Sequence, residues 1–290
     1  MTTFDYKTAF SRNIGLLSEN EQEKLRVKRI AIPGCGGVGS LHALTCARAG
    51  FEKFTLADFD RYELANFNRQ YGARMSTIDT LKVETIAKDI LEINPHADIR
   101  IMREGINVDN LEEFLVDVDI VLDSLDYFAF EARDLLFPKC QDLNIPLLTA
   151  APLGFSAACL AFNGQSMRYT DYFDFKESDS SVDKALKFAI GLAPKGLHIP
   201  YMDPKSVDLQ QRRGPSSIVA INLCAAFLVC DAISLLLDRK KIRPVPYYKQ
   251  FDLYRGKWKK GRLWLGNKNP LQKIKLKIIK LILKRRGKGL

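Results

Sequence analysis

Four glycines near the start of the chain have the spacing of a phosphate-binding loop. They are Gly34, Gly36, Gly37 and Gly39, of which the first, second and fourth match G-x-G-x-x-G, and the apolar run 29–33 comes directly before them. A tight turn of this kind exposes backbone N–H groups and a helix N-terminus, and both attract phosphate. The loop alone suits a redox dinucleotide and ATP equally well, so its neighbours must decide between them.

Basic and amide side chains follow this loop in the sequence. Asp58 ends the next apolar run, where a carboxylate can accept hydrogen bonds from ribose hydroxyls. The segment "NFNRQ" then supplies Asn66, Arg69 and Gln70, and Lys82 lies on the next expected helix. Arg69 can bind two phosphate oxygens at once and Lys82 adds a movable point charge, which suits a triphosphate and a pyrophosphate leaving group. A hydride-transfer site has no evident need for both, so the pair favours ATP over a nicotinamide dinucleotide.

Two carboxylates end the fourth expected strand. The run "VLDSLD" places Asp123 and Asp126 at the carboxyl edge of the sheet, where ligands of such folds bind. A carboxylate that faces phosphates calls for a cation, and Mg²⁺ held by one or two acidic groups plus phosphate oxygens is the usual solution. We assign this role to Asp126, whereas Asp123 is equally well explained as the cap of the next helix.

Short apolar runs that alternate with helical segments predict the sheet that holds these residues. We expect strands at residues 29–33, 54–58, 98–102, 119–123 and 146–150, and less regular ones at 158–163 and 248–254. Helices are expected at 41–48 before Gly50 and at 83–91 before Asn94-Pro95. The fold class is therefore α/β, a doubly wound Rossmann-like and mostly parallel sheet with crossover helices.

Together these motifs resemble the adenylation domain of the ThiF/MoeB family, which includes the ubiquitin-activating enzymes. The resemblance rests on "GCGGVG", "DFD", "NFNRQ", "LKVE" and "LDSLD", in order, and covers roughly residues 10–240. In that family a carboxylate, often the C-terminal glycine of a ubiquitin-like protein, attacks the α-phosphate of ATP and leaves as an acyl-adenylate. The implied nucleotide site comprises Gly34, Gly36, Gly37, Gly39, Asp58, Asp60, Asn66, Arg69, Gln70 and Lys82, with magnesium on Asp126.

The resemblance also implies an arginine that acts in trans. Family members use one from near the N-terminus of the second subunit, and "FSRNIGLL" puts Arg12 at that place. We therefore expect a homodimer in which Arg12, Arg69, Lys82 and Asp126 are the catalytic residues. The expected organisation is one adenylation domain over 1–254 with a polar loop or lid at about 171–215, followed by a basic amphipathic tail over 255–290.

Two features depart from the family pattern. Many members bind a structural zinc through two Cys-x-x-Cys pairs, but "SMRYTDYFDF" stands where the first pair would fall, so no zinc is expected. Members that form a thioester use a cysteine in a loop over the site, whereas residues 164–223 contain none. Release of the acyl-adenylate to an outside nucleophile is thus the simpler expectation.

The basic excess of the chain lies at its C-terminal end. The net charge is +10, yet residues 253–290 contain 14 Lys plus Arg and no acidic residue. On a helical wheel, Lys273, Lys277, Lys280 and Lys284 form a narrow stripe beside a broad apolar face. Such a tail suits an anionic membrane. Packing on the dimer or on a partner is an equal alternative, and binding to a nucleic acid such as tRNA ranks third.

The remaining composition indicates a cytoplasmic protein. The six cysteines are scattered, and the N-terminus lacks the pattern of a secretory signal, so we expect a cytoplasmic enzyme that is peripheral to the membrane at most. The apolar segment 218–237 could span a bilayer by length, but Asn222 and Asp231 within it favour a buried core helix.

These observations favour one function over three others. The leading hypothesis is an ATP- and Mg²⁺-dependent adenylyltransferase that activates a carboxylate of a protein, a peptide or a small acid. A tRNA-modifying enzyme that resembles the threonylcarbamoyladenosine dehydratases is the first alternative. A non-catalytic scaffold subunit is the second, although such subunits typically lose their phosphate-binding basic residues, and a nicotinamide oxidoreductase is the last.

Overall fold

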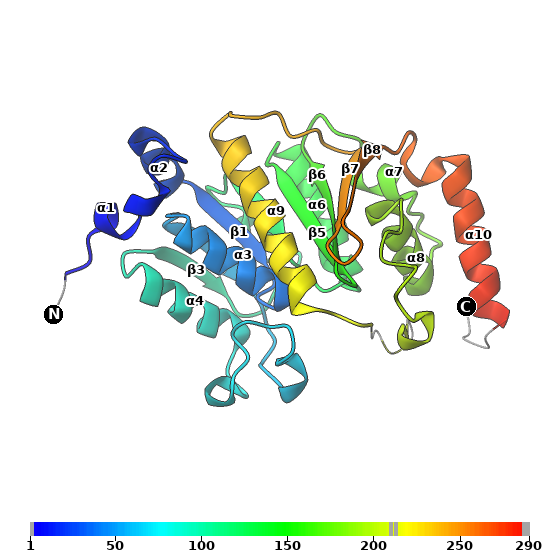
Figure 1. Ribbon diagram of the computed structural model, residues 1–290, viewed down its shortest axis with the longest axis horizontal. Helices are drawn as coiled ribbons and strands as arrows, with labels where there is room; N and C mark the ends of the chain where they lie inside the picture. The colour runs from blue at the N-terminus through cyan, green and yellow to red at the C-terminus, as the bar shows by residue number, and fades with distance from the viewer. Residues whose placement is uncertain (1–2, 209–210, 212–213, 286–290) are drawn as a thin grey trace.

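A single eight-stranded sheet runs through the computed structural model, which describes residues 3–208, 211 and 214–285 (Figure 1). The strand order is β3-β2-β1-β4-β5-β6-β7-β8. The strands are β1 Arg29–Pro33, β2 Lys53–Ala57, β3 Asp98–Met102, β4 Ile120–Asp123, β5 Leu147–Leu153, β6 Ser156–Phe162, β7 Tyr247–Asp252 and β8 Lys257–Arg262.

The sheet has a parallel half and an antiparallel half. Strands β1 to β5 are parallel, and β1 pairs with β2 on one side and β4 on the other. The chain therefore reverses its direction of progress at β1, which is the point where doubly wound sheets bind ligands at their carboxyl edge. From β5 onward the pairs are antiparallel. The mostly parallel Rossmann-like fold expected from the sequence is confirmed.

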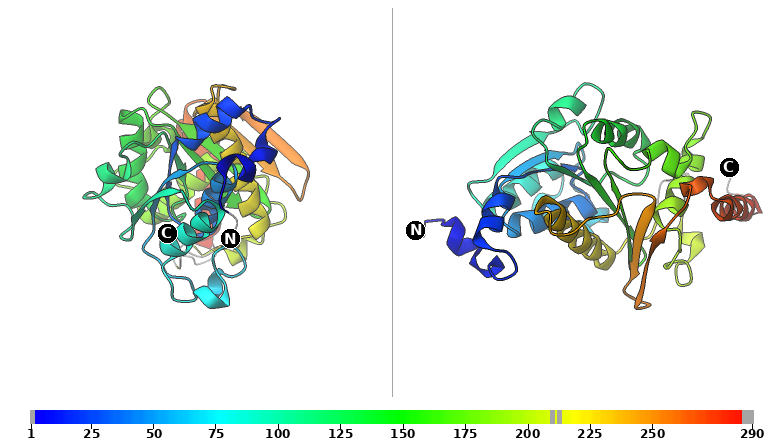
Figure 2. Two further views of the ribbon diagram at one scale, coloured as in Figure 1. Left: turned by 90° about the vertical axis from the view of Figure 1, so that its left-hand side faces the viewer. Right: turned by 90° about the horizontal axis from the view of Figure 1, so that it is seen from above.

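Helices cover both faces of the sheet (Figure 2). They are α1 Tyr6–Ala9, α2 Glu19–Arg26, α3 Gly37–Arg48, α4 Lys82–Ile93, α5 Leu111–Phe114, α6 Phe130–Asp142, α7 Tyr169–Phe173, α8 Ser181–Leu192, α9 Ile218–Leu236 and α10 Pro270–Arg285. Single 3-10 turns are η1 Ser11–Asn13, η2 Leu64–Asn66, η3 Met75–Thr77, η4 Pro204–Ser206 and η5 Gly266–Lys268.

The side chains on the two faces of the central strands belong to two different apolar cores. Ile30 and Ile32 of β1 pack with α3, α4 and α9 in one core. Ala31, which points the opposite way, belongs to a second core that includes α6, α7 and α8. Because side chains alternate along a strand, burial on both faces explains why β1 is apolar without interruption after Arg29.

Helix α9 is the element that raised the question of a membrane span. In the described part of the chain it is the one helix long and apolar enough to cross a bilayer. It packs along α3, β5 and β6, and Cys224, Leu228 and Ala232 are buried against the sheet. This packing agrees with the core helix expected from the sequence.

The segment expected to be a loop or lid contains a 12-residue helix. Residues 181–192 form α8, whose N-terminus has a capping box between Ser180 and Asp183. Lys187 Nζ donates to Asp179 Oδ2 at 2.6 Å, and both side chains are buried, so the polar stretch before α8 is pinned to it. The sequence did not predict this helix because its first turn is polar. Positions 209–210 and 212–213 of the expected lid lie outside the described residues.

The sheet also continues beyond residue 254, where we expected the tail to begin. Strand β8 pairs with β7 over six residue pairs, from Tyr247 with Arg262 to Asp252 with Lys257. Lysine-rich composition concealed this strand, but lysine is common on edge strands because its charge discourages pairing with another sheet. The tail proper is therefore the helix α10, and residues 286–290 lie outside the described part.

Candidate active site

The glycine loop connects β1 to α3 and is too tightly packed for side chains at two of its positions. A Cβ on Gly34, whose φ is +104°, would lie 2.6 Å from the carbonyl oxygen of Ser124. A Cβ on Gly39 would lie 1.8 Å from the carbonyl oxygen of Gly34. At Gly36, the N-cap of α3, the nearest atom is Gln70 Nε2 at 3.8 Å. The loop is thus closed toward the protein and leaves room beside the helix N-terminus, as a phosphate site requires.

The other glycine of the loop contacts the core helix. A Cβ on Gly37 would lie 2.7 Å from Ile221 Cδ1 of α9. Nearby, Asn68 Nδ2 donates to the carbonyl oxygen of Ser216, just before α9 begins. The N-termini of α3 and α9 and the segment after β2 therefore form one packed unit, a connection that sequence reasoning missed because its partners lie far apart in the chain.

Asp58 fastens the loop after β2 to the glycine loop. Its carboxylate accepts hydrogen bonds from Cys35 N at 2.6 Å and from Asp60 N at 2.7 Å. Burial raises the pKa of Asp58, and these two backbone bonds oppose that change. Each carboxylate oxygen can accept a further bond, so Asp58 both shapes the loop and keeps acceptors for a hydroxyl ligand.

Lys82 and Asp60 form an ion pair beside Asp58. Lys82 Nζ donates to Asp60 Oδ2 at 2.8 Å. The lysine side chain is 7% exposed and the aspartate 52% exposed, so the ammonium is buried and its partner can turn away into solvent. A buried ammonium with a replaceable counter-ion is suited to receive an anionic ligand.

The segment from Asn66 to Gln70 borders the glycine loop. Gln70 is buried with its amide nitrogen toward Gly36, and its Oε1 has no hydrogen-bond partner in the described part of the chain. Asn66 is buried too, and its Oδ1 accepts from Glu63 N at 3.0 Å. Arg69 Nη1 instead donates to the carbonyl oxygen of Ala65 at 2.8 Å, so its guanidinium folds back on its own turn. Arg69 must rotate to reach a ligand beside Gly36.

Asp126 stands alone and exposed after β4. Its Oδ1 accepts from Phe128 N at 2.9 Å, and it has no ion pair within the described residues. The preceding Ser124 Oγ donates to the carbonyl oxygens of Pro33 and Gly34 at 2.9 and 2.8 Å. Because this hydroxyl ties the two strand ends together, Asp126 lies on the same edge of the sheet as the glycine loop.

Asp123 has a structural role that the sequence did not reveal. It is buried, accepts from Thr149 Oγ1 at 2.7 Å and lies 3.5 Å from Arg133 Nε. Arg133, also buried, donates to the carbonyl oxygens of Leu125 and Asp126 at 2.7 Å each. The N-cap of α6 is Ala129, so Asp123 is not its cap. The pair holds the loop that carries Asp126. Arg133 gave no distinctive sequence signal, because α6 also contains Glu131, Asp134 and Lys139.

Arg12 is the one expected catalytic residue that lies away from the others. It is in η1, where the neighbouring Asn13 donates to the carbonyl oxygen of Ala49 at the C-terminal end of α3. The glycine loop is at the other end of this 12-residue helix, about 18 Å away at 1.5 Å per residue. Figure 1 shows the same separation, with α1 at the far side of the sheet from the start of α3. Arg12 therefore does not join the site of its own chain.

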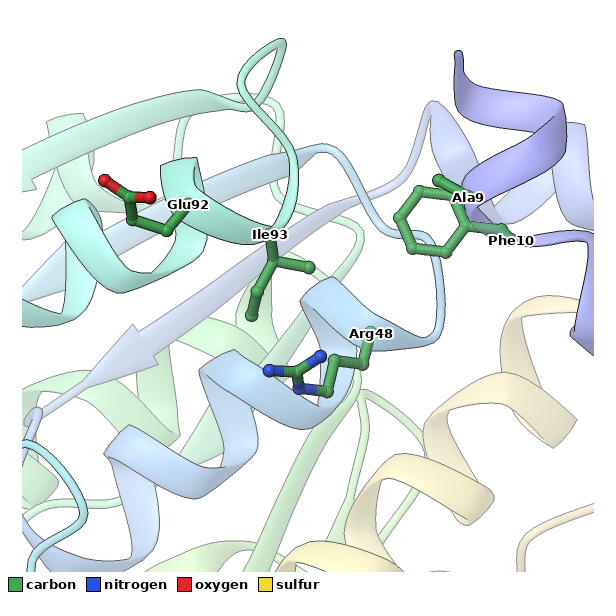
Figure 3. A pocket seen from close by; sticks show the side chains of 5 residues that line it. All are labelled: Ala9, Phe10, Arg48, Glu92 and Ile93. Carbon is green, nitrogen blue, oxygen red and sulfur yellow. The ribbon is translucent and has the colours of Figure 1, made fainter. Parts of the chain in front are cut away.

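A cavity of about 310 Å³ beside η1 is distinct from this site. Figure 3 shows its lining by Ala9, Phe10, Arg48, Glu92 and Ile93, at the C-terminal ends of α3 and α4. The glycine loop and Lys82 are at the N-terminal ends of the same two helices. The cavity thus lies on the opposite side of the molecule from the carboxyl edge.

The side chains at the carboxyl edge fit a nucleotide with a divalent cation better than a cation alone. Across residues 3–208, 211 and 214–285 there is no group of three His, Cys, Asp or Glu side chains that could hold a metal. Asp126 could therefore hold Mg²⁺ only together with ligand oxygens, as is usual for this ion on phosphates. The unpaired Oε1 of Gln70, the open space at Gly36 and the buried Lys82 are consistent with such a ligand. The expected lack of zinc stays a prediction.

Fold and site together define a doubly wound α/β protein with a glycine-rich loop at the switch point of its sheet. The chain belongs to the ThiF family, whose model matches residues 10–273. It is similar to the molybdopterin-synthase adenylyltransferase of Haemophilus influenzae, with 33% identity over 132 residues, 46% of this chain and 54% of that protein. It is also similar to the tRNA threonylcarbamoyladenosine dehydratase of Bacillus subtilis, with 31% identity over 142 residues, 49% of this chain and 55% of that protein. The matches thus span just over half the length of these relatives.

Solved structures share the fold at low sequence identity. The chain aligns with PaaA at a TM-score of 0.67 and 18% identity, covering 90% of this chain and 75% of that one. It aligns with a structure of Escherichia coli MccB with ATP at a TM-score of 0.62 and 19% identity, covering 84% and 66%. At these identities the alignments show the common architecture alone.

Proposed function

We propose that the protein is an adenylyltransferase that uses ATP and Mg²⁺ to activate a carboxylate as an acyl-adenylate. The observation that carries the proposal is the gathering of the open glycine loop, the buried Lys82 and the free Asp126 at one sheet edge. The names of the similar proteins, several of which are adenylyltransferases, support it. So does the solved MccB structure that contains ATP.

In this proposal each side chain has a defined task. Asp58 accepts from the ribose hydroxyls, while the N–H groups at the start of α3 bind phosphate oxygens. Lys82 exchanges Asp60 for the polyphosphate, and Arg69 rotates from its own turn to join it. Asp126, with phosphate oxygens, holds Mg²⁺, which would neutralise charge on the phosphates.

The reaction follows from the class of substrate. A carboxylate oxygen of the partner forms a bond to the α-phosphorus, and the bond from that phosphorus to the bridging oxygen breaks. Pyrophosphate leaves with the bonding electrons. Negative charge grows on the leaving oxygen, and the cations of Lys82 and Arg69 stabilise it there.

We further propose a homodimer in which Arg12 of each chain serves the site of the other. Arg12 is exposed and lies at the far end of α3 from its own glycine loop. An arginine in that position can meet a phosphate only in a second copy. This assembly completes the set of cations around the polyphosphate.

The acyl group is proposed to leave on an outside nucleophile rather than on an enzyme thiol. Five of the six cysteines are buried, and burial raises the pKa of each of these thiols. The sixth, Cys230, is exposed, but it lies three turns into α9, away from the glycine loop. Neither kind of thiol is placed for transfer.

The identity of the partner divides the proposal into two branches. A ubiquitin-like or sulfur-carrier protein, a peptide or a small acid is the first, in line with relatives named after the sulfur carrier ThiS and molybdopterin synthase. A carboxylate on tRNA is the second, and the similarity to tRNA threonylcarbamoyladenosine dehydratases favours it. We also propose a cytoplasmic location for either branch.

ATP–pyrophosphate exchange with a panel of carboxylate partners tests the proposal. The panel comprises sulfur-carrier proteins, C-terminal peptides, small acids and threonylcarbamoylated tRNA. We expect exchange with one class, and its loss in Asp126→Ala with an unchanged melting temperature. Asp109→Ala, which removes another exposed carboxylate, is the matched control. Exchange that survives Asp126→Ala would contradict the assigned role, and no exchange with any class would contradict the function.

A further inference from the structure

Helix α10 is held against the domain in one fixed orientation. Gln272 is buried, and its Nε2 donates to the carbonyl oxygen of Ile190 in α8 at 2.7 Å. Lys275 Nζ donates to the carbonyl oxygen of Pro194 at 2.6 Å, and Lys280 pairs with Asp183. These contacts occupy the face of α10 that is turned toward the domain, and they fix the direction in which its other face points.

The outward face of α10 is a ridge of exposed aliphatic side chains. Leu271, Ile274, Ile278, Leu281 and Ile282 are 68%, 52%, 51%, 51% and 44% exposed. At 100° per residue they fall in one arc of about 100°. Trp264, which is 61% exposed, lies just before the helix. Scattered apolar residues are ordinary on a protein surface, but a continuous ridge of this kind marks an interaction site.

A row of lysines borders this ridge. Lys273, Lys277 and Lys284 are exposed and have no ion pair or side-chain hydrogen bond within residues 3–208, 211 and 214–285. On the same wheel they occupy an arc of about 40° next to the aliphatic arc. The cations and the apolar ridge thus face one side of the molecule together.

We propose that this face of α10 docks on the surface of an anionic lipid bilayer, with the helix lying in the plane of the interface. The aliphatic ridge would enter the boundary between headgroups and acyl chains, and the three lysines would bind anionic headgroups. Trp264 would sit at headgroup level, where tryptophan is favoured. This inference concerns where the enzyme is held and does not depend on the proposed reaction.

Charge complementarity favours lipid over the other possible occupants. A second copy would present the same positive face, because no acidic residue lies in 253–290 to pair with the lysines. A nucleic acid would meet aliphatic side chains, which cannot stack on bases. An anionic bilayer matches both the apolar centre and the basic border.

The position of α10 is compatible with activity at the membrane. Figures 1 and 2 show it at the end of the molecule opposite α1 and α2, outside β8 and α8. The glycine loop lies at β1, whose neighbours in the sheet are β2 and β4. Docking through α10 would therefore leave the nucleotide site open to solvent.

Cosedimentation of the full chain with vesicles tests this proposal. We expect binding to vesicles of phosphatidylglycerol and phosphatidylcholine, and background sedimentation with phosphatidylcholine alone. The double variant Ile274→Ser, Ile278→Ser should lose binding to background. The matched control is Val108→Ser with Val116→Ser, two exposed apolar residues that flank α5, outside α10. Replacing Lys273, Lys277 and Lys284 by Gln should weaken binding about fivefold per lysine, an effect that added salt reduces in the wild type.

Four results would overturn the proposal. One is background sedimentation of the wild type with anionic vesicles. A second is a loss of vesicle binding in the Val108→Ser, Val116→Ser control that equals the loss in the isoleucine variant. The third is a wild-type dimer that becomes a monomer in the isoleucine variant, which would assign the ridge to a second copy. The fourth is tRNA binding that the same variant abolishes. Melting curves of all variants test for misfolding, which we do not expect because every changed side chain is exposed.

Discussion

Several charged side chains at the carboxyl edge of β1, β2 and β4 are buried and paired, whereas most charged side chains along β8 and α10 are exposed to solvent. Arg133, Asp123 and Lys82 belong to the first group, and Lys259, Lys273 and Lys277 to the second. Burial of a charge is costly unless partners compensate for it, so the first region can change little without loss. The second region can change freely unless something binds there. The difference agrees with the two proposals, in which the first region carries out the reaction and the second contacts a membrane.

The Arg133–Asp123 pair should give the largest effect. Arg133→Met removes one partner of a buried ion pair and leaves Asp123 an uncompensated charge, so we expect a loss of about 3–5 kcal/mol in the free energy of unfolding. Lys139→Met on the same helix breaks a pair with the exposed Glu112 and should cost less than about 1 kcal/mol. Denaturant unfolding measures both. Equal losses would mean that the pair does not hold the Asp126 loop.

Lys82 should come next, with an effect on rate rather than stability. Lys82→Gln removes a cation proposed to stabilise the leaving phosphate, and loss of one such group typically lowers the rate about 10²–10³-fold. Lys88→Gln changes an exposed lysine on the same helix and should leave the rate unchanged. The rate of ATP–pyrophosphate exchange is the readout. A Lys82 variant as fast as the Lys88 variant would remove Lys82 from the site.

Acid should destabilise the protein through His42, one turn into α3 from the glycine loop. Its two ring nitrogens are buried without partners in the described residues, and burial lowers the pKa of His42 to about 3. The unfolded chain then binds a proton that the folded chain excludes, so stability is complete above about pH 6.5 and falls as the pH drops toward 3. Between pH 7 and pH 5 the protonation of His42 in the unfolded chain lowers the free energy of unfolding by about 2 kcal/mol.

A comparison of two histidine variants isolates the loss of stability that His42 causes in acid. His42→Leu should lessen the loss of unfolding free energy between pH 7 and pH 5, whereas His96→Leu, at an exposed position, should not. Unfolding curves at each pH provide the measurement. If the His42 variant keeps the wild-type acid dependence, the imidazole is not buried in the neutral form.

The smallest effects are expected on the basic edge strand. Lys259→Gln in β8 changes an exposed side chain without an ion pair in the described residues and should alter the free energy of unfolding by less than about 0.5 kcal/mol. The exchange rate should also stay as in the wild type. A large change in the free energy of unfolding or in the exchange rate would show that β8 is as sensitive to substitution as the carboxyl edge.

The central parallel strands were readable from the sequence because they are buried on both faces. The expected run 29–33 coincides with β1, the expected run 119–123 contains β4, and the glycine loop follows β1 as expected. The charged strand β8 gave no such signal, since an edge strand needs no apolar face. The polar start of α8 hid that helix in the same way.

The sequence motifs indicated which segments border the glycine loop, but not which backbone groups their neighbours bind. Lys82 pairs with Asp60, and Gln70 lies beside Gly36, and all four residues belong to those motifs. Ser124 was not predicted because it binds carbonyl groups about 90 residues earlier in the chain, which only the fold brings close. Arg133 was not predicted because it binds carbonyl groups of the loop before its own helix, a contact that no motif indicates. The back-folded guanidinium of Arg69 is likewise a local contact that no spacing rule could indicate.

Calorimetric titration of the purified chain with ATP and Mg²⁺ is the decisive test of the proposed nucleotide site, because it needs no knowledge of the carboxylate partner. We expect that ATP binds, that its affinity falls when Lys82 is replaced by Gln or Mg²⁺ is omitted, and that NAD does not bind. Failure to bind ATP, or binding of NAD in its place, would contradict the assignment of this sheet edge to carboxylate activation.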